Sequence, residues 1–139
     1  MSTKVHVRAE GQGKPVVFVL TGGERHDQVA LPALTHRGAI KRVGRGRPRL
    51  RPHRLVGDKG YSSRRVRQDL RRRGSGYVIP RKVNERRAPR FDRTAYRERN
   101  RVERLINRLK QCRRIATRYE KRAANYHAML TIAAILLWF

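Results

Sequence analysis

The stretch LVGDKGYSS at residues 55–63 carries the clearest structural signal in this chain. Its first three residues are apolar and predict a short buried strand, which delivers Asp58 at its carboxyl end. Ser62 or Ser63 can then cap a helix that stops at Gly74. An Asp in this position can point into the crevice where α/β sheets place their ligands. An ordinary turn-forming Asp ahead of a glycine would give the same pattern.

The residues before this stretch predict a β-hairpin followed by a helix. Residues 3–9 alternate loosely between polar and apolar, and residues 15–20 form an apolar, β-branched run. The two segments lie on either side of a glycine-bearing turn, which is typical of a hairpin. Asp27 can cap a helix that continues through Val29, Leu31 and Leu34.

The residues after it predict one more strand and then helices. Residues 77–79 form a short apolar run ended by Pro80, and the chain is expected to be helical from about residue 94. The element order predicts a mixed α/β sheet covered by helices. The apolar run at residues 128–139 is shorter than the roughly 20 residues that a membrane-spanning helix needs, so it predicts a buried core helix and no membrane partner.

Charge points to a polyanionic partner. Lys and Arg number 36 against 10 acidic residues, a formal net charge of +26. Self-repulsion of this size opposes compaction unless a polyanion offsets it, and nucleic acid is the obvious counter-charge. Codon bias in a GC-rich genome would also enrich Arg over Lys, and an anionic membrane or ribosomal RNA would satisfy the same charge. One cysteine and the lack of an apolar leader fit the cytoplasm.

Two basic loops are the expected contacts with the nucleic acid backbone. Residues 41–54 read KRVGRGRPRLRPHR, with seven Lys or Arg among interleaved Gly and Pro, and residues 81–93 form a second basic loop. We expect both to contact phosphates with little readout of bases, whereas a solvated, mobile connection would have the same composition. The candidate DNA-contacting residues are Arg45, Arg47, Arg49, Arg51 and Lys59.

A second pattern lies in the helical region. Tyr96, Arg99, Glu103 and Lys110 are separated by three, four and seven residues. On one continuous helix, at about 100° per residue, all four fall within a sector of roughly 60°. An acid would then be flanked by two cations and a phenol. A plain ion pair between Arg99 and Glu103 across one turn would explain the spacing as well.

These residues resemble a known family. The spacing Y-(2)-R-(3)-E-(6)-K is similar to the signature of a superfamily of bacterial insertion-sequence transposases of the DDE type. DKGYS at residues 58–62 resembles the segment around the family's second catalytic Asp, and VIP at residues 78–80 resembles the strand that follows. RNRVER at residues 99–104 resembles its helix, and the hairpin residues are similar to the family's early hairpin.

The resemblance implies an RNase H-like fold and a metal-dependent activity. Such enzymes hold two divalent metals, Mg²⁺ or Mn²⁺, with two Asp and one Glu, hydrolyse DNA to free a 3′-OH, and join that end to target DNA. Asp58 and Glu103 correspond to the second Asp and the Glu, as catalytic residues and metal ligands. Tyr96, Arg99 and Lys110 correspond to the rest of the signature and would contact DNA.

The family's first catalytic Asp lies on a strand that precedes the hairpin, so residues 1–139 would be the C-terminal portion of the catalytic domain. That strand is central in this fold, and an upstream DNA-recognition region is also expected outside this sequence. The chain alone would therefore be inactive. The implied partners are double-stranded DNA (element ends and target), the upstream transposase segment, and further copies of the chain on paired ends, at the nucleoid.

Three alternatives stay open at this stage. The chain could be the downstream frame of a gene read by ribosomal frameshifting, or a decayed, truncated copy. It could also be a non-catalytic DNA-binding remnant that inhibits transposition, with Asp58 and Glu103 as leftovers.

Overall fold

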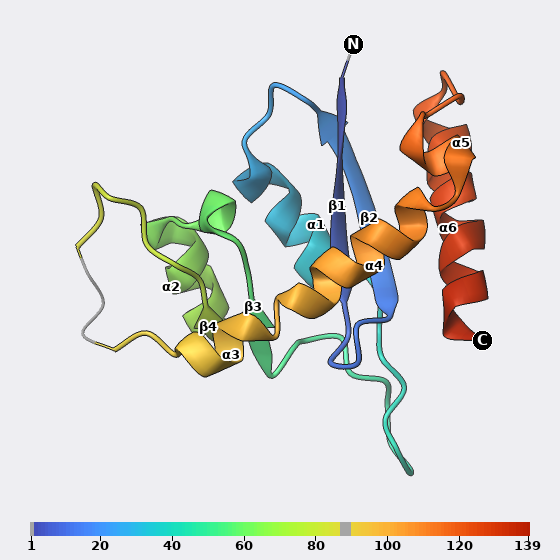
Figure 1. The fold of residues 1–139 in the computed structure, drawn as a ribbon. Coiled ribbons are helices and arrows are strands. Elements are labelled where there is room, and N and C mark those ends of the chain that lie inside the picture. The colour runs from blue at the N-terminus through green and yellow to red at the C-terminus, as the bar shows by residue number, and fades with distance from the viewer. Residues whose placement is uncertain (1, 87–89) are drawn as a thin grey trace. The chain divides into compact units, whose positions relative to one another are not determined.

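A computed structural model describes residues 2–86 and 90–139 as a mixed α/β protein with two compact units (Figure 1). One unit joins residues 1–24 to residues 100–139, and the other consists of residues 25–99. The mixed α/β class predicted from the sequence is confirmed. In place of the single sheet that was predicted, the described residues form two separate two-stranded sheets, one in each unit. Local patterns identify strands but do not specify which distant strands pair.

The first unit is built on the predicted hairpin. Strand β1 (Thr3–Ala9) pairs antiparallel with β2 (Pro15–Gly22), with Val5 opposite Leu20 and Val7 opposite Phe18. Side chains alternate between the two faces of a strand, and Val7, Phe18 and Leu20 face the helices of this unit. Phe18 is 6% exposed and belongs to the core of this unit. The hairpin prediction is confirmed.

Three helices complete this unit: α4 (Asn100–Lys110), α5 (Arg113–Ala116) and α6 (Ala123–Trp138). Leu105 and Leu109 of α4 pack with Leu130 of α6, which is 1% exposed, so one face of α6 is buried. The prediction of a buried core helix holds for that face alone, because Ile132, Ile135 and Leu136 are 54%, 52% and 72% exposed. Within the described part of the chain, no helix is both long enough and apolar enough to cross a membrane.

The second unit begins with a 3₁₀ turn, η1 (Asp27–Ala30), that runs into α1 (Leu31–His36). Leu31 and Leu34 are buried as the helix prediction requires, whereas Val29 is 52% exposed. The prediction that Asp27 caps this segment is wrong. His26 occupies the cap position, no side chain bonds there, and Asp27 lies inside the first turn.

The stretch at residues 55–63 forms the start of a β-α-β arrangement. Strand β3 (Arg54–Val56) pairs in parallel with β4 (Gly76–Val78), and α2 (Arg64–Arg72) connects them. Two parallel strands require such a crossover, because a tight turn can join only antiparallel ones. Val66 and Leu70 of α2 pack in the core of this unit.

Helix α2 begins at a serine cap, as the sequence predicted. Ser63 Oγ accepts a hydrogen bond from Val66 N at 3.1 Å. We expect Ser63→Ala to lower the free energy of unfolding by about 1 kcal/mol, because it leaves a backbone N–H at the helix start without its partner. Urea denaturation measures this, and Ser63→Asp, which keeps an acceptor at the cap, is the matched control. An unchanged midpoint in Ser63→Ala would show that the cap contributes nothing.

The helical region does not run on continuously from residue 94. Helix α3 (Arg93–Arg97) ends in a turn at Glu98 and Arg99, and α4 begins at Asn100. Asp92 caps α3, and the N–H groups of Glu98 and Arg99 bond to carbonyls three residues back, which tightens the chain out of the α-helix. The single helix sector predicted for Tyr96, Arg99, Glu103 and Lys110 is therefore wrong, because 100° per residue does not hold across the break.

Candidate functional site

Asp58 lies where the strand prediction placed it, at the carboxyl end of β3. Gly57 N donates to Val78 O at 3.1 Å, which extends the parallel pairing up to the residue before Asp58. Asp58 Oδ1 then accepts from Lys59 N at 2.6 Å and starts the 3₁₀ turn η2 (Lys59–Tyr61). Its side chain is 55% exposed. The carboxylate is thus held by its own turn but open to solvent.

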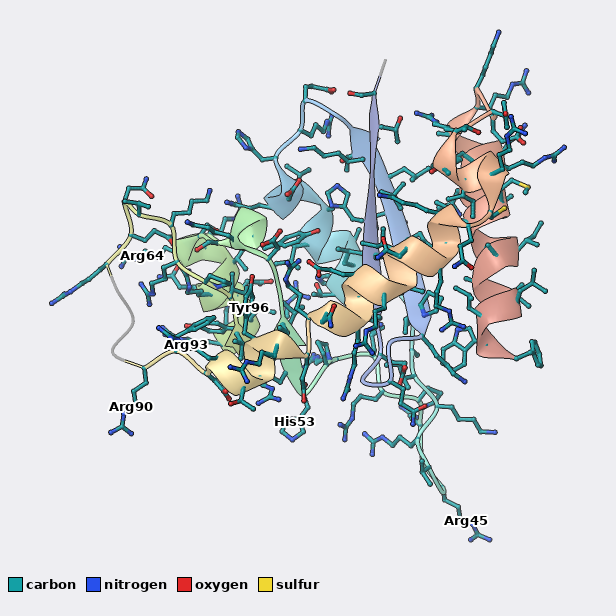
Figure 2. The ribbon with its side chains drawn as sticks, viewed as in Figure 1. Arg45, His53, Arg64, Arg90, Arg93 and Tyr96 are labelled. Atoms are coloured by element: carbon teal, nitrogen blue, oxygen red, sulfur yellow. The ribbon has the colours of Figure 1, made fainter. Side chains whose placement is uncertain are left out.

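The structure brings Arg99 to this carboxylate and Tyr96 to Arg99. Arg99 Nη1 lies 3.9 Å from Asp58 Oδ2, and the Arg99 guanidinium lies 5.6 Å from the centre of the Tyr96 ring. Tyr96 in turn packs against Phe91, with ring centres 5.4 Å apart. Figure 2 labels Tyr96 on α3. An acid, a cation and an aromatic ring therefore form one cluster, assembled from β3, α3 and the turn that ends α3.

The turn after Asp58 packs closely against η1. A Cβ at Gly60 would meet the Asp27 carboxylate, so a larger residue there would displace this side chain. Gln28 Nε2 also donates to Ser62 O at 3.1 Å. Burial, together with the negative charges of Asp27 and Asp58, raises the pKa of Tyr61 to about 12. Tyr61 is therefore a protonated phenol at neutral pH.

Glu103 and Lys110 both lie on α4, in the unit that does not contain Asp58. Both are exposed, whereas Leu105 and Leu109 of the same helix are buried. Seven residues make two turns, so the two side chains leave one face of α4 about 10 Å apart along its axis. This part of the predicted pattern survives the helix break, since it needs α4 alone.

Sequence reasoning missed a buried polar network beside Asp58. Arg67 of α2, only 5% exposed, donates from Nη1 to Glu85 Oε1 at 3.1 Å and from Nη2 to Glu85 Oε2 at 3.2 Å. Arg67 Nη2 also donates to Ser62 Oγ, and Ser62 Oγ to Glu85 Oε2, both at 2.5 Å. Hydrogen bonds from Arg67, partly opposed by burial, lower the pKa of Glu85 to about 2.

This network ties the second basic loop to the Asp58 turn. The loop follows β4, so parallel pairing brings it to the same sheet edge as Asp58. Lys82 N donates to Glu85 Oε2 at 2.9 Å, so the backbone of this loop is also bonded to the network. The signal for this in the sequence was weak: Arg67 lies about 60° from Leu70 around α2, close to the apolar face. Part of this loop, residues 87–89, lies outside the described residues.

The first basic loop leaves its four predicted contact residues, Arg45, Arg47, Arg49 and Arg51, exposed. Lys59 is exposed as well. Among the residues described, no three His, Cys, Asp or Glu side chains gather closely enough to hold a metal ion. Asp58 and Glu103 are hard oxygen donors of the kind that Mg²⁺ and Mn²⁺ prefer, and both reach solvent.

Comparison with known proteins assigns a family to this chain. Residues 1–138 match the family model described as "Transposase DDE domain". A protein of Burkholderia cepacia named "Putative transposase for insertion sequence element IS402" is 32% identical over 135 residues, which cover 97% of this chain and 62% of that protein. The chain thus spans less than two thirds of this relative's length. No solved structure matches it significantly. The family match covers nearly every residue, and the chain therefore belongs to the DDE-type insertion-sequence transposases.

Proposed function

We propose that this chain is the C-terminal part of a transposase catalytic domain that cleaves and joins DNA at the ends of an insertion sequence. The observation that carries the proposal is Asp58, an exposed carboxylate at the carboxyl end of β3 with the cation of Arg99 beside it. The sheet edge that presents Asp58 also presents the basic loop after β4. A carboxylate within reach of phosphate-binding cations suits chemistry on a phosphodiester.

Asp58 and Glu103 would be the metal ligands that this chain contributes. Their oxygens suit Mg²⁺ or Mn²⁺ in kind, and two such ions would activate the attacking oxygen and stabilise the leaving one. The third carboxylate would come from an upstream segment. The match covers 62% of the Burkholderia relative, so that protein has further residues outside the matched part.

The cations of this chain would hold the DNA strand. The ion pair between Arg99 and Asp58 is 3.9 Å long, with side chains 29% and 55% exposed, and such pairs contribute little to stability. Arg99 can therefore turn from the carboxylate to a phosphate at small cost, with its guanidinium still on the Tyr96 ring. Lys59 and Lys110 would add phosphate contacts from η2 and α4.

The proposed fold is RNase H-like, with residues 1–139 as an incomplete copy of its sheet. Within the described residues β1 pairs with β2 alone. The upstream strand would pair with β1 and become central, which would cover an edge otherwise open to other strands. The partners would be the element ends, target DNA and further copies of the protein on paired ends, in the cytoplasm at the nucleoid.

Reconstitution tests the proposal. The 139 residues are fused in frame to the polypeptide encoded immediately upstream, and both forms are incubated with duplexes that carry the element end. We expect Mg²⁺-dependent release of 3′-OH ends by the fusion and none by the 139 residues alone, because two carboxylates cannot fix both ions. Cleavage products separated on a denaturing gel give the result.

Two other outcomes would change the proposal. Strand transfer by the 139 residues alone would mean that another carboxylate completes the site, and Asp27, which lies against Gly60, would be the first to test. A fusion that binds the element ends without cutting them would favour the non-catalytic inhibitor. An upstream frame with flanking inverted repeats would favour a frameshift product over a decayed copy.

A further inference from the structure

The first basic loop is a closed projection with a defined base. Ile40 N donates to Arg49 O at 2.9 Å, and Arg49 N donates to Ile40 O at 2.8 Å. This pair of bonds closes the loop at residues 41–48. All of these residues are exposed, and Val43 is fully so. From the sequence, this loop could equally have been a mobile, solvated connection. The pairing of Ile40 with Arg49 holds its two ends together, so the loop projects from the protein.

The tip of this loop carries an arginine between two residues without side chains. Figure 2 shows Arg45 at its far end, pointing away from the protein. Gly44 and Gly46 flank Arg45 with φ values of +98° and +134°, which side-chain-bearing residues rarely adopt. A Cβ at Gly44 would have no atom within 4 Å, so the glycine there keeps the tip thin without relieving any crowding. Arg47 follows Gly46 and precedes Pro48, which fixes the backbone.

The Arg45 tip suits the minor groove of B-DNA. That groove is about 6 Å wide and about 7.5 Å deep, too narrow for a helix about 10 Å across and for the two paired chain segments at the base of this loop. An arginine side chain presented between two glycines can enter it. At roughly 3.3 Å per residue, the tip reaches up to about 15 Å beyond the Ile40–Arg49 pair. This is enough to pass the phosphates while the base of the loop stays outside.

We propose that Arg45 and Arg47 insert into the minor groove of duplex DNA and favour A·T-rich sequence. The proposal rests on the DNA-dependent function above and adds a sequence preference to it. A·T tracts have a narrow minor groove with enhanced negative potential that attracts arginine, and G·C pairs place the guanine 2-amino group on its floor. Arg49 and Arg51, at and beyond the base of the loop, keep the phosphate contacts predicted from composition.

The test isolates the minor groove chemically. Three duplexes of equal length are compared by fluorescence anisotropy with the in-frame fusion of the 139 residues to the upstream segment: A·T-rich, G·C-rich, and the G·C sequence with inosine in place of guanine. Inosine removes only the minor-groove amino group and leaves the major-groove edge intact. We expect the A·T and inosine duplexes to bind about tenfold more tightly than the G·C duplex.

Charge-preserving variants separate groove insertion from phosphate attraction. Arg45→Lys with Arg47→Lys keeps the net charge but replaces the guanidinium with a more strongly hydrated ammonium. Gly46→Ala also keeps the charge and places a Cβ where φ is +134°. We expect both changes to reduce the preference to about twofold, with affinity for the G·C duplex unchanged. Arg64→Lys with Arg65→Lys, two exposed positions on α2, is the matched control and should keep the full preference.

Each other result overturns the inference in a recognisable way. Equal binding to all three duplexes, with a steep salt dependence, would leave phosphate contact and remove groove insertion. A preference that survives in both loop variants would place the reading residues elsewhere. Absence of binding to any duplex would count against the proposed DNA function itself, and so is distinct from failure of the groove preference.

Discussion

Glu103→Gln in the protein fused to its upstream segment is expected to slow DNA cleavage by about a thousandfold or more, while DNA affinity and melting temperature stay nearly unchanged. The substitution removes one ligand charge at constant shape. A loss of about 4 kcal/mol in stabilisation of the transition state corresponds to this factor. Folding should be spared, because Glu103 is exposed on α4 while Leu105 and Leu109 make the core contacts. Single-turnover cleavage of an end-labelled duplex measures the rate.

Glu98→Gln is the matched control. Glu98 is also an exposed acid of the helical region and lies 3.6 Å from Arg54, with side chains about half exposed. Its loss should change neither cleavage nor stability beyond a few tenths of a kcal/mol. If Glu103→Gln instead unfolds the protein, or cuts at the normal rate, the plain ion pair between Arg99 and Glu103 becomes the better interpretation.

Arg67→Met is expected to lower the free energy of unfolding by about 3 kcal/mol, because it breaks a buried, two-bonded ion pair and leaves the Glu85 charge without its cation. Arg67 and Glu85 side chains are 6% and 20% exposed. Ser62 Oγ would lose a donor as well. Urea denaturation at neutral pH measures the effect, and Arg72→Met is the control. Arg72 forms an ion pair of 3.5 Å with Asp69, but its side chain is 78% exposed. Its loss should therefore change stability by less than about 0.5 kcal/mol.

The double variant Arg67→Met with Glu85→Gln should lose less stability than the two single variants added together. Removing both charges leaves no unpaired ion, so the pair should show an interaction energy of at least about 1 kcal/mol. Additive single effects would show that the two side chains act independently, whatever their distance.

The same pair gives a pH dependence of known sign. The pKa of Glu85 falls from its usual 4.5 to about 2 in the folded chain, chiefly through hydrogen bonds from Arg67. The unfolded chain therefore takes up the proton first as pH falls. The stabilisation is full above about pH 5 and is lost as pH falls through 4.5 toward 2. Solvent near Glu85 screens the pair, so we expect about 1 to 2 kcal/mol from this source. A stability difference between wild type and Glu85→Gln that stays constant from pH 7 to 3 would contradict it.

The sequence by itself determined the local elements and the family. A loosely alternating segment and a β-branched apolar run around a glycine-bearing turn specify the hairpin of β1 and β2, and the apolar run before Asp58 specifies β3. The serine after that run caps α2 as predicted. Residues 58–62 and the Tyr96–Lys110 spacing indicated the insertion-sequence transposases, and the family match confirms that family for the chain. The catalytic roles of Asp58 and Glu103 stay predictions.

Only the tertiary structure decided which distant residues contact one another, at Asp58 and elsewhere. The approach of Arg99 to its carboxylate, the burial of Arg67 against Glu85, and the pairing of Ile40 with Arg49 each join residues that are not neighbours in an element. Composition counts the charges of these arginines without their partners. A charge becomes buried or exposed only when distant segments pack. The helix break at Glu98 and Arg99 depends on hydrogen bonds to carbonyls three residues back, which apolar periodicity does not predict.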